Sequence, residues 1–162
     1  MTVFRITIPG KPYAKRRPRA GVVPKTGRSR TYNAAGNRTA EDAVAYHVGQ
    51  IIKTPIEGPV RVTITAIFEI PKSWPKYKQR EAAATLHTQK PDFDNVAKWV
   101  LDGMNRVAFA DDGQVADCRT IKIWGKRAET LIEVAPAPRA FGDWSPNDFS
   151  ELRRRILGEG QA

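Results

Sequence analysis

The alternation of hydrophobic and polar residues predicts four β-strands. A period of two places successive side chains on opposite faces of a strand, and Phe4, Ile6 and Ile8 share one such face near the start of the chain. Segments with this pattern cover residues 2–8, 60–70, 115–124 and 130–134. The last two are separated only by Gly125-Lys126-Arg127, which predicts that they form a hairpin.

Three segments between these strands have helical periodicity: residues 33–53, 76–86 and 94–105. The resulting order is β-α-β-α-α-β-β, which predicts an α+β fold with a single mixed sheet and helices packed against it. After residue 135 the sequence PAPRAFGDW is typical of a linker, and Ser145-Pro146 is a typical start for a short C-terminal helix. We therefore expect one domain over residues 1–135 and a C-terminal extension over residues 136–162.

Composition narrows the class of protein. With 162 residues, of which 41% are hydrophobic and 27% charged, the chain has the make-up of one globular domain. No apolar run approaches the ~20 residues that span a bilayer, so we expect no membrane partner. The N-terminus alternates like a strand and lacks the apolar block of a signal peptide. The single cysteine, Cys118, cannot form an internal disulfide, which fits a reducing compartment, and we expect a cytoplasmic protein.

The net charge of +10 is concentrated at the N-terminus. Ten of the 27 basic residues lie within residues 1–40, which contain no acidic residue, and the remaining 17 balance the 17 acidic residues of the chain. A basic block punctuated by proline and glycine, here the predicted loop 9–30, typically contacts a phosphate backbone, although it could also be a solvated loop. The residues that we expect to bind DNA are Lys11, Lys15, Arg16, Arg17, Arg19, Arg28, Arg30 and, ahead of the acidic segment, Lys90.

An acidic segment contrasts with this basic block: six aspartates lie within residues 92–117. If residues 90–94 are extended, Asp92 and Asp94 project to the same side and could share one divalent cation. Carboxylates in this number suit Mg²⁺, which keeps several waters for a substrate phosphate. On the helix that follows, Lys98 lies one turn beyond Asp94 and Asp102 one turn further, so an ammonium group would stand beside the carboxylates.

Each of these residues also has a structural interpretation. Asp94 could be a helix N-cap, and Asp94, Lys98 and Asp102 a solvated ladder of charges. The sequence Asp111-Asp112-Gly113 could be a turn that leads into the next strand. The spacing alone leaves a metal site and these structural roles open.

The segment KPDFDNVAKWVLDGMNRVAFADDGQV resembles the signature of the RusA family of Holliday junction resolvases, which are common in bacteria and their prophages. The shared elements are an Asp-x-Asp-Asn motif, a lysine four residues after its second aspartate, a further aspartate in the same helix, and Asp-Asp-x-Gln-Val. The resemblance is sharp over residues 90–122, and the opening IPGKPYAKRRPR is also similar to the family. It does not reach residues 136–162.

The resemblance implies a RusA-like fold and a homodimer that binds four-way DNA junctions and nicks two opposing strands with Mg²⁺, in DNA recombination and repair at the nucleoid. It implies that Asp92, Asp94 and Asp112 bind the metal and that Lys98 is an essential cation, with Asp102 and Asp111 in supporting roles. Whether Mn²⁺ replaces Mg²⁺ stays open. The rival hypotheses are a less selective nuclease of branched DNA and a non-catalytic, basic nucleic-acid-binding module.

Overall fold

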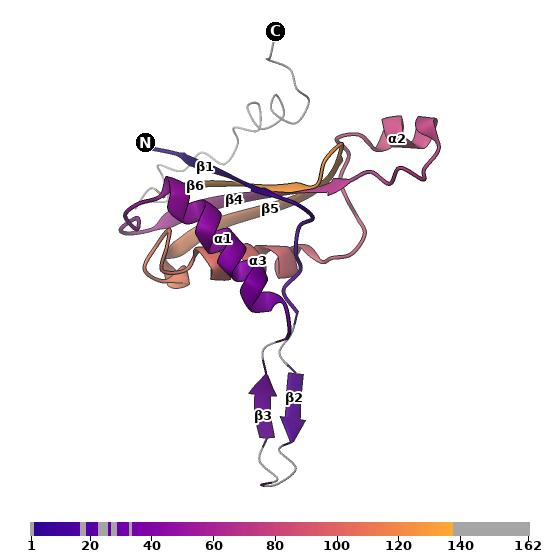
Figure 1. Ribbon diagram of the computed structural model, residues 1–162. Helices are drawn as coiled ribbons and strands as arrows, with labels where there is room; N and C mark the ends of the chain where they lie inside the picture. Colours follow the sequence, from indigo (N-terminus) through magenta and orange to yellow (C-terminus); the bar gives the residue numbers. More distant parts are fainter. Residues whose placement is uncertain (1, 17–18, 23–25, 27–28, 33, 138–162) are drawn as a thin grey trace.

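A computed structural model describes residues 2–16, 19–22, 26, 29–32 and 34–137 (Figure 1). Along the chain the elements are β1 (Phe4–Pro9), β2 (Arg19–Val22), β3 (Ser29–Tyr32), α1 (Asn37–Ile51), β4 (Val60–Glu69), α2 (Lys76–Ala82), α3 (Phe93–Met104), the 3-10 turn η1 (Asp112–Gln114), β5 (Val115–Gly125) and β6 (Glu129–Pro136). The predicted C-terminal helix after Ser145 lies outside the described residues.

Four strands form one mixed sheet in the order β1-β6-β4-β5, which confirms the predicted α+β fold. Strand β6 runs antiparallel to both β1 and β4, whereas β5 runs parallel to β4. The predicted hairpin of β5 and β6 is wrong, because β4 lies between them. Residues Ile64–Phe68 of β4 are all buried, so this strand is covered on both faces and belongs at the centre of the sheet.

The predicted loop 9–30 contains regular structure that the sequence pattern did not indicate. Strands β2 and β3 pair antiparallel, with Arg19 opposite Tyr32 and Val22 opposite Ser29, and form a separate two-stranded sheet. We call these two strands the basic ribbon; it projects away from the main sheet (Figure 1). Its strands are only four residues long and carry charged residues and a glycine in place of an apolar alternation, so the period of two was not visible.

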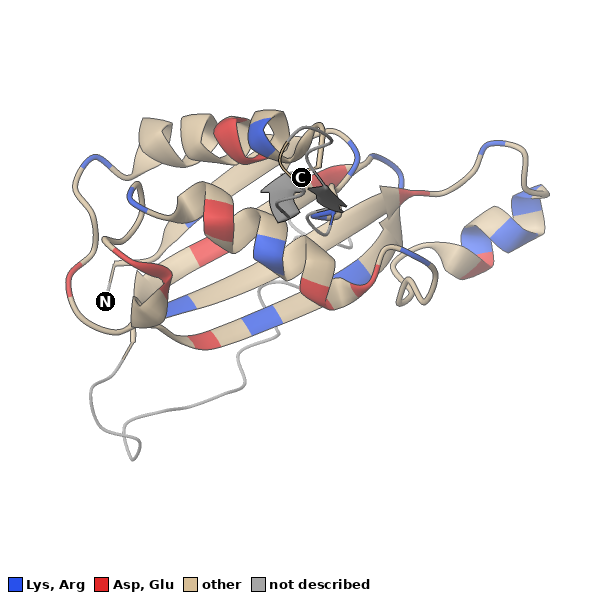
Figure 2. Ribbon diagram, turned by 90° about the horizontal axis from the view of Figure 1, so that it is seen from below, with Lys and Arg blue, Asp and Glu red and all other residues tan. Residues whose placement is uncertain are grey.

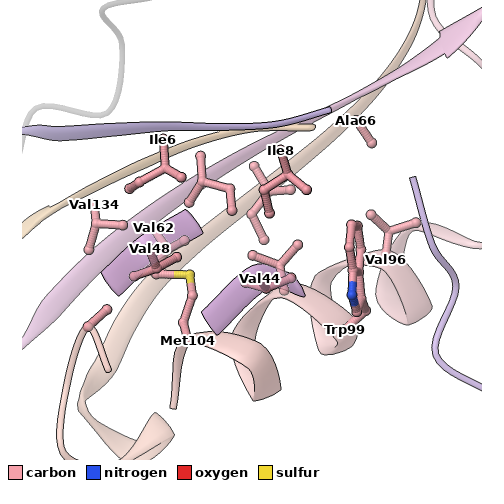
Figure 3. Close-up of a cluster of buried hydrophobic side chains, with 14 of the residues drawn as sticks. Ile6, Ile8, Val44, Val48, Val62, Ala66, Val96, Trp99, Met104 and Val134 are labelled. Atoms are coloured by element: carbon pink, nitrogen blue, oxygen red, sulfur yellow. The ribbon is translucent and has the colours of Figure 1, made fainter. Parts of the chain in front are cut away.

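Helices α1 and α3 cover one face of the main sheet and enclose the hydrophobic core (Figure 3). The core side chains come from both helices and from β1, β4 and β6; they include Ile6, Val44, Val48, Val62, Val96, Trp99, Met104 and Val134. The two helices approach closely at Gly103, where an added Cβ would lie 2.5 Å from the Cβ of Val44. The Trp99 indole also donates a 2.8 Å hydrogen bond to the Ala40 carbonyl, so α3 is fixed firmly against α1.

Within the described residues, none of the helices has the length and apolar composition needed to cross a bilayer.

Candidate active site

Helix α3 begins inside the acidic motif. Asp92 occupies the N-cap position with extended backbone, Phe93 is the first helical residue, and Asp94 lies in the first turn. The condition considered above, extended backbone over residues 90–94, therefore does not hold beyond Asp92: an aspartate at the N-cap and another in the first turn both favour a helix start at this point. The preceding Lys90–Pro91 peptide bond is cis. The Lys122 ammonium on β5 donates hydrogen bonds to the Gln89 and Pro91 carbonyls, which holds this helix start against the sheet.

The carboxylates of Asp92 and Asp94 are exposed and available to an external cation. The Asp92 side chain makes no capping hydrogen bond. In the described part of the chain, no hydrogen bond or ion pair occupies either carboxylate. Lys98 is exposed one helical turn beyond Asp94, as its spacing predicted. Carboxylates, an ammonium group and the positive end of the α3 dipole thus meet at one end of the helix.

Asp102 has a different environment from Asp92 and Asp94. Its carboxylate pairs with the Lys15 ammonium, which also lies 2.8 Å from a Glu41 carboxylate oxygen. Burial disfavours the charged form of Lys15, but its hydrogen bonds to Asp102 and Glu41 outweigh this effect, and the pKa of Lys15 is raised above its ordinary value. Lys15, which we predicted to bind DNA, therefore links the N-terminal segment to α1 and α3.

The basic ribbon is rooted beside the start of α3. The Lys15 backbone N–H donates a 3.0 Å hydrogen bond to the Asn95 carbonyl. Asn37, which is buried at the start of α1, bonds both the N–H and the carbonyl of Arg16, and its side-chain oxygen also accepts from the Tyr13 hydroxyl. The sequence analysis missed Asn37, because one asparagine near a predicted helix start carries no signal of burial.

Asp111 and Asp112 are adjacent in sequence but differ in their contacts. The Asp111 carboxylate accepts a 2.8 Å hydrogen bond from the Gly113 N–H, and Gln114 completes a capping box around this turn. The Gln114 amide also donates to the Ile56 and Gly58 carbonyls, which makes it a structural residue. Asp112 is exposed at the first position of η1.

Asp112 and the pair Asp92 and Asp94 lie at opposite ends of β5. Val115, just after η1, is level with Val60 on β4, whereas Lys122, which holds Pro91, is level with Ala66. Six residues of strand correspond to about 20 Å. Consistent with this separation, the described residues contain no group of three or more His, Cys, Asp or Glu side chains that could hold a metal ion.

Apart from Lys15, the residues that we predicted to bind DNA fall into three groups. Lys11, Arg16 and Lys90 are exposed. Arg19 and Arg30 belong to the basic ribbon. Arg17 and Arg28 lie outside the described residues.

Comparisons with known proteins agree with the resemblance of the motif. The family model described as endodeoxyribonuclease RusA matches residues 9–135, which include β4, α3, β5 and nearly all of β6 but only the last residue of β1. The chain is also 30% identical over 144 residues to the uncharacterized protein YqaN of Bacillus subtilis (strain 168), an alignment that covers 85% of this chain and 100% of that protein. The chain therefore belongs to the RusA family of endodeoxyribonucleases.

Proposed function

We propose that this protein is a Mg²⁺-dependent, structure-selective endodeoxyribonuclease that resolves four-way DNA junctions by paired nicks during recombination and repair. The observation that carries the proposal is the pair of exposed carboxylates, Asp92 and Asp94, at the start of α3 beside the root of the basic ribbon. The membership of the RusA family supports DNA as the substrate.

The residues at the start of α3 fit a hard divalent cation. Mg²⁺ prefers oxygen ligands and is often bound by one or two carboxylates plus water and phosphate, and the oxygens of Asp92 and Asp94 are accessible for this purpose. Bound Mg²⁺, or Mn²⁺ in its place, would neutralise the scissile phosphate and lower the pKa of a water. Lys98 would stabilise negative charge that develops on the phosphodiester, and the carboxylates would position the DNA strand through the cation that they hold.

A homodimer is part of the proposal. A four-way junction has two-fold symmetry, so a two-fold dimer can place one site on each of two opposing strands. Asp112 is exposed at the start of β5, whereas Asp92 follows Pro91, whose carbonyl is bonded by Lys122. The levels of Val115 and Lys122 are separated by six residues of the neighbouring β4, about 20 Å. A second copy of the chain would therefore be the way to bring Asp112 of one protomer to the carboxylate pair of its partner.

The basic residues would hold the DNA on either side of the cut. Lys11, Arg16 and Lys90 are exposed; Arg16 follows Lys15, which is bonded to Asn95 of α3, and Lys90 lies two residues before Asp92. The basic ribbon carries further basic residues away from the sheet. We expect these residues to contact phosphates without reading the base sequence. The protein would act in the cytoplasm on chromosomal or prophage DNA at the nucleoid.

A substrate panel tests this function. We expect the wild-type protein with Mg²⁺ to nick a synthetic four-way junction on opposing strands and to leave a linear duplex intact. Asp92→Asn should bind the junction as well as the wild type. Its nicking rate should fall about 100-fold or more, because a ligand for the cation is lost. Asp42→Asn, an exposed aspartate on α1, changes the charge equally and should cut normally.

Each rival predicts another outcome of the same panel. A less selective nuclease would cut flaps and forks as fast as junctions. A non-catalytic binding module would cut none of the substrates. Undiminished cutting by Asp92→Asn would refute the role given to the carboxylates.

A further inference from the structure

Residues 71–90, which we call the α2 arm, leave the end of the main sheet, form the projecting helix α2 and return alongside β5, where Ala84 and His87 donate backbone hydrogen bonds to β5 carbonyls (Figures 1 and 2). Helix α2 at its tip has seven residues, none of which is buried, so packing against the core does not explain their composition. The arm contains one acidic residue, Glu81, and five basic residues: Lys72, Lys76, Lys78, Arg80 and Lys90. Three of the basic residues, Lys76, Lys78 and Arg80, belong to α2, and Figure 2 shows basic charge on this projecting helix.

The base of the α2 arm is held by a chain of aromatic contacts. Trp74 packs against Trp124 of β5 with ring centroids 5.2 Å apart, and His87 lies 4.3 Å from the same ring. His87 also stacks on Phe68 of β4 at 4.0 Å, and its backbone N–H donates to the Lys122 carbonyl. The arm is therefore an ordered projection in a fixed position relative to the sheet.

The tip of the α2 arm combines an exposed aromatic ring with cations. Tyr77 is 66% exposed, although burial is usually favourable for such a large ring. Lys76, Lys78 and Arg80 are exposed on the same short helix, and the Lys78 ammonium lies 4.1 Å from the centre of the Trp74 ring. Surfaces that bind unpaired nucleotides combine the same two features, since phosphates pair with cations and bases stack on aromatic rings.

The position of the arm relates this surface to the candidate active site. The arm ends at Lys90, and the next residues are Pro91 and Asp92 at the start of α3. The Lys122 ammonium bonds the Gln89 and Pro91 carbonyls and so joins the arm, the sheet and the carboxylate pair. The segment that leads into the basic ribbon is held to α3 by the hydrogen bond from the Lys15 N–H to the Asn95 carbonyl. The basic ribbon and the α2 arm therefore both connect to the protein close to the start of α3.

We infer that the α2 arm is a second DNA-binding surface, which contacts the phosphates and stacks on an unpaired base of the branched substrate next to the cut. The inference rests on the proposed function and specifies the substrate of the same site. An acidic protein partner would also match the basic charge, but an exposed ring among cations, in a member of the RusA family, favours DNA with unpaired bases.

The first test removes two cations from the arm. Lys76→Ala/Arg80→Ala should weaken junction binding and reduce the dependence of log K on log salt by up to about two units, since each phosphate contact contributes close to one. Lys53→Ala/Arg106→Ala is the matched control, because it removes the same charge beyond the far ends of α1 and α3. If both double variants lose affinity and slope equally, the arm attracts DNA only through net charge and the inference is wrong.

The second test concerns the ring of Tyr77. In fluorescence anisotropy with the wild-type and variant full-length proteins, Tyr77→Ala should weaken binding to a junction with unpaired bases about tenfold, as expected for one lost stacking contact. It should not change binding to a blunt duplex, and Tyr77→Phe should bind both DNAs normally because the ring remains. Unchanged junction affinity of Tyr77→Ala, or an equal loss in Tyr77→Phe, would overturn the stacking role.

Nicking assays separate this inference from the proposed function. Variants of the arm leave Asp92 and Asp94 intact, so we expect a higher KM for junction DNA with an unchanged kcat. If the wild-type protein neither binds nor nicks junctions, the proposed function fails. If the wild type does both and the arm variants match it, the function stands and the role of the arm is refuted. If the wild type binds polyglutamate, and the arm variants lose this binding but bind DNA normally, the arm is a protein-docking surface. That result would also refute its role in DNA binding.

Discussion

At the scale of single residues, the aspartates of the acidic segment differ in whether their oxygens already have partners. Asp102 pairs with Lys15, and Asp111 accepts a hydrogen bond from the Gly113 N–H. Asp92 and Asp94 are exposed and, among the described residues, have no such partner. A carboxylate that is already engaged in the fold is less available to a metal ion, so these contacts rank candidates that the sequence alone leaves equal.

His87 provides a residue-scale prediction about pH. Burial, followed by the charge of Lys122, lowers the pKa of His87, so the folded protein favours the neutral ring. Below the unfolded value of about 6.5, the unfolded chain binds this proton more readily than the folded one. The free energy of unfolding should therefore fall as the pH drops below about 6.5, and less steeply in His87→Gln. Urea unfolding between pH 7.5 and 5 measures both slopes, and equal slopes would show that His87 does not titrate in this way.

At the scale of elements, the contact between α1 and α3 fixes the orientation of the candidate site. Gly103→Ala should lower the free energy of unfolding by about 1–3 kcal/mol, a typical cost of overpacking. The new Cβ would lie 2.5 Å from the Val44 Cβ and 2.8 Å from the Glu41 carbonyl oxygen, neither of which is the end of a flexible side chain. Chemical denaturation with an unchanged m-value measures this loss.

Gly49→Ala in α1 is the matched control for this prediction. Its Cβ would lie 3.7 Å from a Val107 methyl group, an ordinary contact. Because alanine favours the helix by up to about 1 kcal/mol over glycine, this variant should be as stable as the wild type or more so. Equal destabilisation of both variants would contradict the close approach of the helices at Gly103.

The elements also show what the sequence could predict and where it failed. Periodicity located the strands of the main sheet and the two helices packed on it, α1 and α3, because their apolar faces form one core. It could not place β4 between β5 and β6, since this pairing depends on contacts distant in sequence. The acidic motif identified the candidate residues, but the engagement of Asp102 by Lys15 and the anchoring of Arg16 by Asn37 required the folded structure.

At the scale of the whole molecule, positive charge extends from the sheet in two directions. The segment before the basic ribbon is hydrogen-bonded to Asn95, and the α2 arm ends just before Pro91, which Lys122 holds against the sheet. Asp92 and Asp94 lie between these two points. A branched DNA could contact both projections while one strand passes the carboxylates. Asp112, at the other end of β5, would take part through a second protomer.

The most direct test of this account is single-turnover nicking of a pre-bound four-way junction on addition of Mg²⁺. We expect Asp92→Asn/Asp94→Asn to bind the junction at least as tightly as the wild type, because two negative charges near the phosphates are removed. Its nicking rate should fall about 100-fold or more at every Mg²⁺ concentration, whereas Asp42→Asn should keep the wild-type rate. Wild-type nicking by the double variant would contradict the central claim that these two carboxylates carry the reaction.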